Sequence, residues 1–123
     1  MKCSIKILFI DDSMNDILLM VHEIKKNGFN IEWKKVERES EMTIELENSK
    51  WDLIIIDYNI PNLNGISALK ILKKKNLNVP IIMVSGMAEN GKAAEAIKTG
   101  AKDYVIKGNY TQLVEVVKKY IKT

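Results

Sequence analysis

Polar side chains follow four apolar runs that are typical of buried strands. Asp57 comes directly after Leu53–Ile56, four consecutive apolar residues of which three are β-branched, as in the middle of a parallel sheet. The same pattern recurs three times: Asp11 and Asp12 follow the run at 5–10, Ser85 follows 79–84 and Lys107 follows 103–106. Because the carboxyl ends of parallel strands share one edge of a sheet, where open α/β folds bind ligands, we expect these side chains to converge on one pocket.

The residue types in this pocket predict phosphoryl chemistry on a carboxylate. Three crowded carboxylates raise one another's pKa values unless a cation neutralises them. Mg²⁺ prefers oxygen ligands, takes one or two carboxylates and completes its shell with water and phosphate oxygens. A lysine opposite the metal suits a dianion held between two positive charges. The set therefore indicates a Mg²⁺ site beside a carboxylate, Asp57, that accepts a phosphoryl group.

Five strand-like and five helix-like segments alternate along the chain and must position these groups. Strands are predicted over 5–10, 31–36, 53–56, 79–84 and 103–106, with the more polar 31–36 at or near an edge. Helices are predicted from Ser13 to a stop at Gly28, over 40–48, from Ile66 into the lysines at 73–75, up to Gly100, and over an apolar face from Leu113 to Ile121. This alternation predicts an α/β fold, a parallel sheet with helices on both faces.

Composition bounds the class of protein. The 123 residues suit one domain, residues 1–123, and the chain is 46% apolar and 28% charged, with no apolar run of the length a membrane span requires. The start, 1–10, lacks a signal-peptide cleavage pattern. One cysteine, Cys3, fits a reducing, cytoplasmic location. The net charge of +3 comes from dispersed lysines with one arginine, Arg38, which is typical of solvated helix faces and not of nucleic-acid binding.

The matched positions together resemble a known family. Asp11-Asp12, Asp57, Ser85-Gly86 and Tyr104-Val105-Ile106-Lys107, in this order, resemble the receiver domain of two-component response regulators and are similar to chemotaxis response regulators. The resemblance extends from Ile5 to about Ile121. It implies a flavodoxin-like, doubly wound five-stranded parallel sheet of strand order 2-1-3-4-5. It also implies a signalling domain that assists its own phosphorylation and dephosphorylation, not an enzyme with turnover.

The resemblance implies a role for each reacting residue. Asp57 would be the phosphoacceptor and would take a phosphoryl group from a phosphohistidine of a sensor histidine kinase or a histidine phosphotransfer protein. Lys107 would pair with one phosphoryl oxygen, and the Ser85 hydroxyl would hydrogen-bond another. By the same resemblance Asp12 would bind Mg²⁺ directly and Asp11 directly or through a water. Asp57 and the backbone carbonyl of Asn59 would complete the protein ligands.

The resemblance also implies a switch. Ser85 would move toward the phosphoryl group, and the aromatic three residues before Lys107, here Tyr104, would rotate inward behind it. This movement would alter the surface made by the fourth helix, last strand and last helix, where a downstream protein would bind. We expect a monomer, or a weak dimer on phosphorylation. Asn59 and Met87, two residues beyond Asp57 and Ser85, could steer the hydrolytic water.

The chain departs from the family pattern after the lysine. Gly108 replaces the usual proline, whose peptide bond tends to be cis; a cis bond without proline costs about 3 kcal/mol or more, so we expect a trans bond or a rearranged loop. The tail 107–110 resembles receivers within hybrid histidine kinases as much as free-standing ones, so both remain open. His22-Glu23-Ile24-Lys25 superficially resembles a kinase phosphohistidine motif, but His22 lies off the apolar helix face and is expected to face solvent.

Other interpretations stay open at this point. Asp11 or Asp12 could cap the first helix, which is compatible with metal binding. A small phosphatase of the haloacid dehalogenase type also uses an aspartate nucleophile, Mg²⁺ and a lysine. Its two aspartates are one residue apart after the first strand, a spacing that Asp11-Asp12-Ser13 lacks. A constitutive interaction module that keeps the fold without phosphorylation is the third possibility.

Overall fold

Strands and helices alternate along the whole described chain. The computed structural model describes residues 4–61, 63–75, 77–86 and 91–121. The elements are β1 (Ile5–Ile10), α1 (Met14–Lys26), β2 (Ile31–Val36), α2 (Glu39–Asn48), β3 (Leu53–Asp57), α3 (Gly65–Lys74), β4 (Ile81–Ser85), α4 (Lys92–Thr99), β5 (Asp103–Ile106) and α5 (Tyr110–Tyr120). None of the helices in this part of the chain has both the length and the apolar character needed to cross a membrane.

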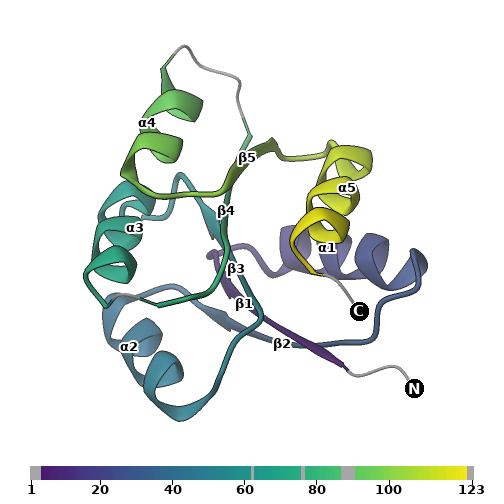
Figure 1. The fold of residues 1–123 in the computed structure, drawn as a ribbon, viewed down its shortest axis with the longest axis horizontal. Coiled ribbons are helices and arrows are strands. Elements are labelled where there is room, and N and C mark those ends of the chain that lie inside the picture. The colour runs from purple at the N-terminus through teal and green to yellow at the C-terminus, as the bar shows by residue number, and fades with distance from the viewer. Residues whose placement is uncertain (1–3, 62, 76, 87–90, 122–123) are drawn as a thin grey trace.

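The five strands form one parallel sheet in the order β2-β1-β3-β4-β5, as predicted. Figure 1 shows the sheet between two helical layers, with α1 and α5 on one face and α2, α3 and α4 on the other. The polar strand β2 lies at an edge, also as predicted. In the registers, Asp57 pairs with Val84 and Ser85 pairs with Ile106, so the carboxyl ends of β3, β4 and β5 are level.

Alternating side chains of the central strands fill two hydrophobic cores. All residues of β3 and β4 are buried, because helices cover both faces. Ile7, Phe9 and Ile55 pack toward α1 and α5, whereas Leu8 and Ile54 pack toward α2, α3 and α4. Burial of each such side chain contributes ~1.5–3 kcal/mol. The two cores therefore hold the strand ends in place as a rigid frame.

A close approach of backbone fixes the segment after Asp57. The Asn64 side chain caps α3 by accepting from the N–H groups of Ile66 and Ser67. A Cβ on Gly65 would lie 2.7 Å from the Asp57 carbonyl oxygen and 2.8 Å from Tyr58 Cα. Only glycine lets the first turn of α3 come this close to the end of β3.

Two strand boundaries differ from the sequence prediction. β4 begins at Ile81 and not at Val79, because Pro80 has no N–H for the ladder and contributes only its carbonyl, which accepts from Ile54 N at 3.1 Å. β3 extends one residue further than predicted and includes Asp57. His22 is exposed, as expected. Cys3 and Met87 lie outside the described residues.

The helix α2 offers a matched test of this packing. Met42 is its one buried residue, with an exposed fraction of 0%, whereas Ile44 in the same helix is 53% exposed. We expect Met42→Ala to lower the free energy of unfolding by about 2–4 kcal/mol, and Ile44→Ala to change it by less than about 0.5 kcal/mol. Urea denaturation of the two variants measures both values. Equal losses would contradict the packing described for α2.

Candidate functional site

The carboxyl edge of the sheet gathers the residues that the sequence singles out. Asp11 follows β1, Asp57 ends β3 and Ser85 ends β4, while Lys107 directly follows β5. One carboxylate oxygen from each of Asp11, Asp12 and Asp57 lies within 4.8 Å of the others. Lys107 Nζ lies 2.8 Å from Asp57 Oδ2 and 3.3 Å from Asp11 Oδ2. Residues up to 96 positions apart in sequence thus share one site.

The two buried carboxylates are oriented in the same way. Asp11 is 1% exposed and Asp57 is 5% exposed. Oδ1 of Asp11 accepts from Ser13 N at 2.9 Å, and Oδ1 of Asp57 accepts from Asn59 N at 3.1 Å, so each is held by the N–H two residues later. In both residues the other oxygen, Oδ2, points toward the Lys107 ammonium. Ser13, not either aspartate, caps α1, so both carboxylates after β1 remain available as ligands.

Ser85 is buried at the end of β4, and its backbone is hydrogen-bonded to Lys107. Its exposed fraction is 0%, and its carbonyl oxygen accepts from Lys107 N at 2.7 Å. The Lys107–Gly108 peptide bond is trans, one of the two expected outcomes, and Gly108 takes a φ of +91°. That left-handed conformation suits glycine. The end of β4 and the lysine are therefore locked together without a proline.

Asp16 is a site residue that the sequence interpretation missed. Its Oδ2 accepts from Lys107 Nζ at 2.7 Å, the shortest of the three contacts between a carboxylate and this ammonium. Asp16 lies in the first turn of α1, where an acid is usually explained by the helix dipole alone. The missed signal is positional: a helix that starts directly after the Asp11-Asp12 pair places its first turn beside the same strand end.

Opposing effects set the protonation of these groups. Burial raises the pKa of Asp11 to about 6, although the Ser13 N–H and Lys107 act against it. Burial lowers the pKa of Lys107, but hydrogen bonds to Asp16 and Asp57 and the charge of Asp11 outweigh it and hold the pKa above its usual range. The hydrogen bond from Lys107 lowers the pKa of Asp16. The lysine is thus a firmly charged cation among four carboxylates.

The donor set fits a hard divalent cation. Among the described residues, the buried Asp11 Oδ2 has no hydrogen-bond partner; Lys107 Nζ reaches it only as an ion pair. The buried Asp11 and Asp57 share one ammonium with the more exposed Asp16, so negative charge is in excess, which costs free energy at a buried place. Oxygen ligands of this kind are those that Mg²⁺ prefers. Asp11, Asp12 and Asp57 can therefore hold such an ion.

The residues around the site connect it to α4. Tyr58 follows Asp57, and its hydroxyl donates to Glu95 Oε1 in α4 at 2.8 Å. The Lys92 ammonium, also in α4, lies 4.4 Å from the centre of the Tyr58 ring. Sequence interpretation did not find this contact, because 37 residues separate Tyr58 from Glu95. Tyr104 is partly buried in β5 and packs on the core toward α2, α3 and α4.

The raised pKa of Asp11 predicts a pH dependence. Since its folded pKa of about 6 exceeds the ordinary value of 3.8, the stabilising contribution is complete below pH 4 and is lost as pH rises through 6. In metal-free buffer, we expect the free energy of unfolding relative to Asp11→Asn to fall by roughly 2–3 kcal/mol between pH 4 and pH 7. Urea denaturation of both proteins at each pH measures it. A difference that does not change with pH would contradict this assignment.

Comparison with known proteins agrees with the fold. The family model "Response regulator receiver domain" matches residues 7–118. The chemotaxis protein CheY of Thermotoga maritima is 30% identical over 118 residues, which are 95% of this chain and 98% of that protein. CheY of Listeria monocytogenes is 29% identical over 103 residues, 84% of this chain and 86% of that protein.

A solved structure supports the same relationship. The receiver domain of the Francisella response regulator 1452 has a TM-score of 0.82 and 30% sequence identity, and the match covers 95% of this chain and 96% of that one. The family model spans most of the chain, and the Thermotoga relative covers nearly all of it. The chain therefore belongs to the response regulator receiver domains of two-component signalling systems.

Proposed function

We propose that Asp57 accepts a phosphoryl group from a phosphohistidine of a sensor histidine kinase or a histidine phosphotransfer protein, in a step that requires Mg²⁺. The observation that carries this proposal is the position of Asp57 Oδ2. It lies at the end of the central strand, 2.8 Å from Lys107 Nζ and within the three-carboxylate cluster. A nucleophile held beside a cation and a metal-binding set is what phosphoryl transfer requires.

In the proposed reaction a carboxylate oxygen of Asp57 attacks the phosphorus atom. The new P–O bond forms as the P–N bond to the donor imidazole breaks, the electron pair stays with the imidazole, and an acyl phosphate results. The Lys107 ammonium, now shared by Asp57 and Asp16, pairs with a phosphoryl oxygen. The Ser85 hydroxyl hydrogen-bonds a second one.

Asp11, Asp12, Asp57 and the backbone carbonyl of Asn59 would hold the Mg²⁺. When bound, the ion neutralises the carboxylates and the charge on the phosphoryl oxygens. The protein's own part is orientation: the Ser13 and Asn59 N–H groups fix the Oδ1 atoms of Asp11 and Asp57. This leaves their Oδ2 atoms directed toward the reacting centre.

The proposed signal passes from Ser85 to Tyr104. Phosphorylation draws the Ser85 hydroxyl toward Asp57, and Tyr104 turns into the space behind it. Tyr104 pairs in register with Met83, two residues before Ser85. The result is a changed surface of α4, β5 and α5, which a downstream protein recognises. Residues 1–123 act as a single receiver domain in this proposal, as a monomer or as a weak dimer once phosphorylated.

Intact mass after incubation with Mg²⁺ and a small phosphodonor tests the proposal. We expect a phosphoryl adduct on the wild type that disappears with EDTA and in Asp57→Asn, because the nucleophile is lost. The matched control is Asp52→Asn, which lies at the opposite end of β3 and should keep the adduct. No adduct from either the small donor or a phosphorylated histidine phosphotransfer protein would refute the proposal and favour a constitutive module.

Asp16 gives a second prediction. Its carboxylate competes with the incoming phosphoryl group for the Lys107 ammonium and adds negative charge beside it. Removing this charge in Asp16→Asn should therefore speed phosphorylation and lengthen the lifetime of the phosphoryl group. Because the pair between Asp16 and Lys107 is partly exposed, we expect a modest increase in rate, about threefold to tenfold. The time course of adduct mass measures both. Glu23→Gln, in the same helix, should leave the rates unchanged, and an unchanged or slower reaction of Asp16→Asn would contradict the role.

A further inference from the structure

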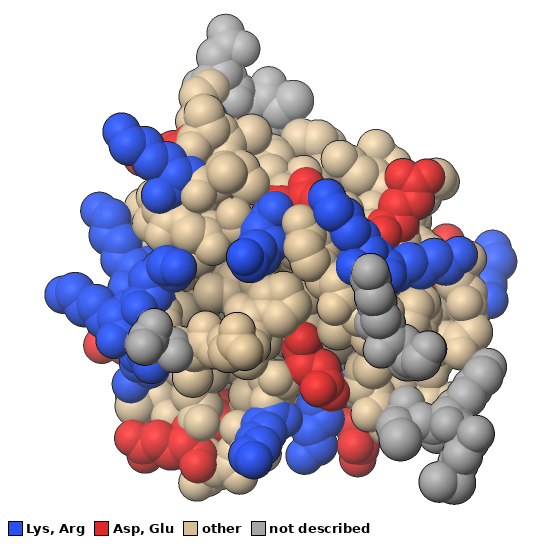
Figure 2. Space-filling model, viewed as in Figure 1, with Lys and Arg blue, Asp and Glu red and all other residues tan. Residues whose placement is uncertain are grey.

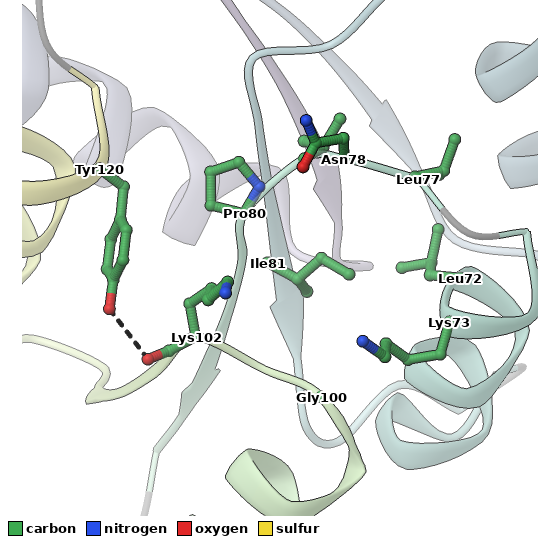
Figure 3. Close-up of a pocket in the computed structure, with 10 residues that line it drawn as sticks. Leu72, Lys73, Leu77, Asn78, Pro80, Ile81, Gly100, Lys102 and Tyr120 are labelled. Atoms are coloured by element: carbon green, nitrogen blue, oxygen red, sulfur yellow. Dashed lines mark hydrogen bonds between the residues drawn. The ribbon is translucent and has the colours of Figure 1, made fainter.

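A hollow lies at the edge of the sheet opposite the carboxylates. Its volume is about 360 Å³, and it lies beside the start of β4, between the end of α3, the turn before β5 and the end of α5. Figure 3 shows Leu72, Pro80 and Ile81 forming an apolar wall, with Asn78 and Tyr120 at the rim. Pockets for small ligands begin at about this size and combine apolar walls with a few polar groups.

Two lysines direct their ammonium groups into this hollow from opposite sides. Lys73 comes from the last turn of α3, and Lys102 immediately precedes β5 (Figure 3). Within the described ranges, neither ammonium forms an ion pair or a hydrogen bond. Two like charges that face one cavity favour an anion between them, because it would neutralise both.

The backbone beside each lysine shapes the wall of the hollow. A Cβ on Gly100 would overlap the Lys73 side chain at Cδ, so the missing side chain leaves room for the lysine stem to cross toward the hollow. The N–H of Lys102 donates to the Ile81 carbonyl at 2.7 Å, and its carbonyl accepts from the Tyr120 hydroxyl at 3.0 Å. The hollow therefore lies where α3, β4, β5 and α5 meet.

The distribution of charge along the chain favours anions on this side. Residues 1–64 contain 8 Lys and Arg against 12 Asp and Glu, a net charge of −4, whereas residues 65–123 contain 11 against 4, a net charge of +7. Figure 2 shows basic side chains gathered over the side of the molecule where α3 lies in Figure 1, and acidic ones over α2. Such a field raises the local concentration of anions.

We propose that this hollow binds a small organic anion. A carboxylate or phosphate group lies between the ammonium groups of Lys73 and Lys102, and a compact apolar body packs on Leu72, Pro80 and Ile81. The limited volume of the hollow and its inward-pointing charges favour a small molecule over an extended peptide. This site is separate from the phosphoacceptor and does not rest on the function proposed for Asp57.

Amide NMR titration of the ¹⁵N-labelled protein, without divalent ions, tests the proposal with four probes. Phenyl phosphate and benzoate should each give saturable shifts at amides near 72–81, 100–102 and 120, with a Kd on the order of 1 mM, as expected for ligands of this size. Benzyl alcohol lacks the charge and inorganic phosphate lacks the apolar body, so both should bind at least about tenfold more weakly. Equal binding of inorganic phosphate would show an adventitious ion only and overturn the site.

Matched variants localise the effect. Lys73→Gln and Lys102→Gln should each weaken phenyl phosphate and benzoate binding by about fivefold to tenfold, since each removes one charged partner. Lys25→Gln removes the same charge from α1 and should leave the Kd unchanged, as should Asp57→Asn at the opposite edge. Equal losses in Lys25→Gln or no saturable shifts would each overturn the assignment. An acidic peptide bearing an aromatic residue is a fifth probe, and a response to it alone would also overturn the assignment.

Discussion

The contact between Lys107 and the carboxylates at the carboxyl edge is the interaction on which the site depends. Buried like charges cost several kcal/mol unless they are compensated, and here one ammonium within 2.7–3.3 Å of Asp11, Asp16 and Asp57 supplies much of that compensation. This compensation of charge requires a parallel sheet, because a parallel sheet brings the carboxyl ends of β1, β3 and β5 to the same edge. The compensation is incomplete with the lysine alone, and the excess of carboxylate charge explains why the site suits a divalent cation.

The segment after Asp57 links the carboxylate site to the rest of the molecule. Tyr58 N donates to the Val84 carbonyl at 2.8 Å, and Gly65 N donates to the Tyr58 carbonyl at 3.2 Å, so the backbone of Tyr58 is tied to β4 and α3. Its side chain reaches Glu95 and Lys92. Helix α4 buries one residue, Ala96, and is held in part by these exposed contacts. A helix with so little buried surface opens or shifts at low cost, as the surface change proposed for α4, β5 and α5 would require.

The strands β4 and β5 run between two regions of opposite charge. At their carboxyl ends lies the acidic site with Ser85, and at their amino ends lies the hollow with Lys73 and Lys102. The lysines in the last turns of α3 and α5 also complement the negative ends of those helices, so part of the basic character at this edge has a structural cause. Lys102 lies outside any helix, so the helix dipole does not explain why a lysine is placed there.

The sequence by itself determined the order of the elements, the sheet and the five positions at its carboxyl edge, because apolar runs and helical spacing are local patterns that survive without knowledge of contacts. It also indicated the carboxylate cluster, since Asp11, Asp12 and Asp57 lie at the carboxyl ends of predicted strands. Tertiary structure alone decided that Asp16 reaches Lys107, that Tyr58 reaches Glu95, and that Lys73 crosses Gly100 toward Lys102. These are contacts between side chains of different elements, and their geometry depends on how helices lie on the sheet, which no local pattern encodes.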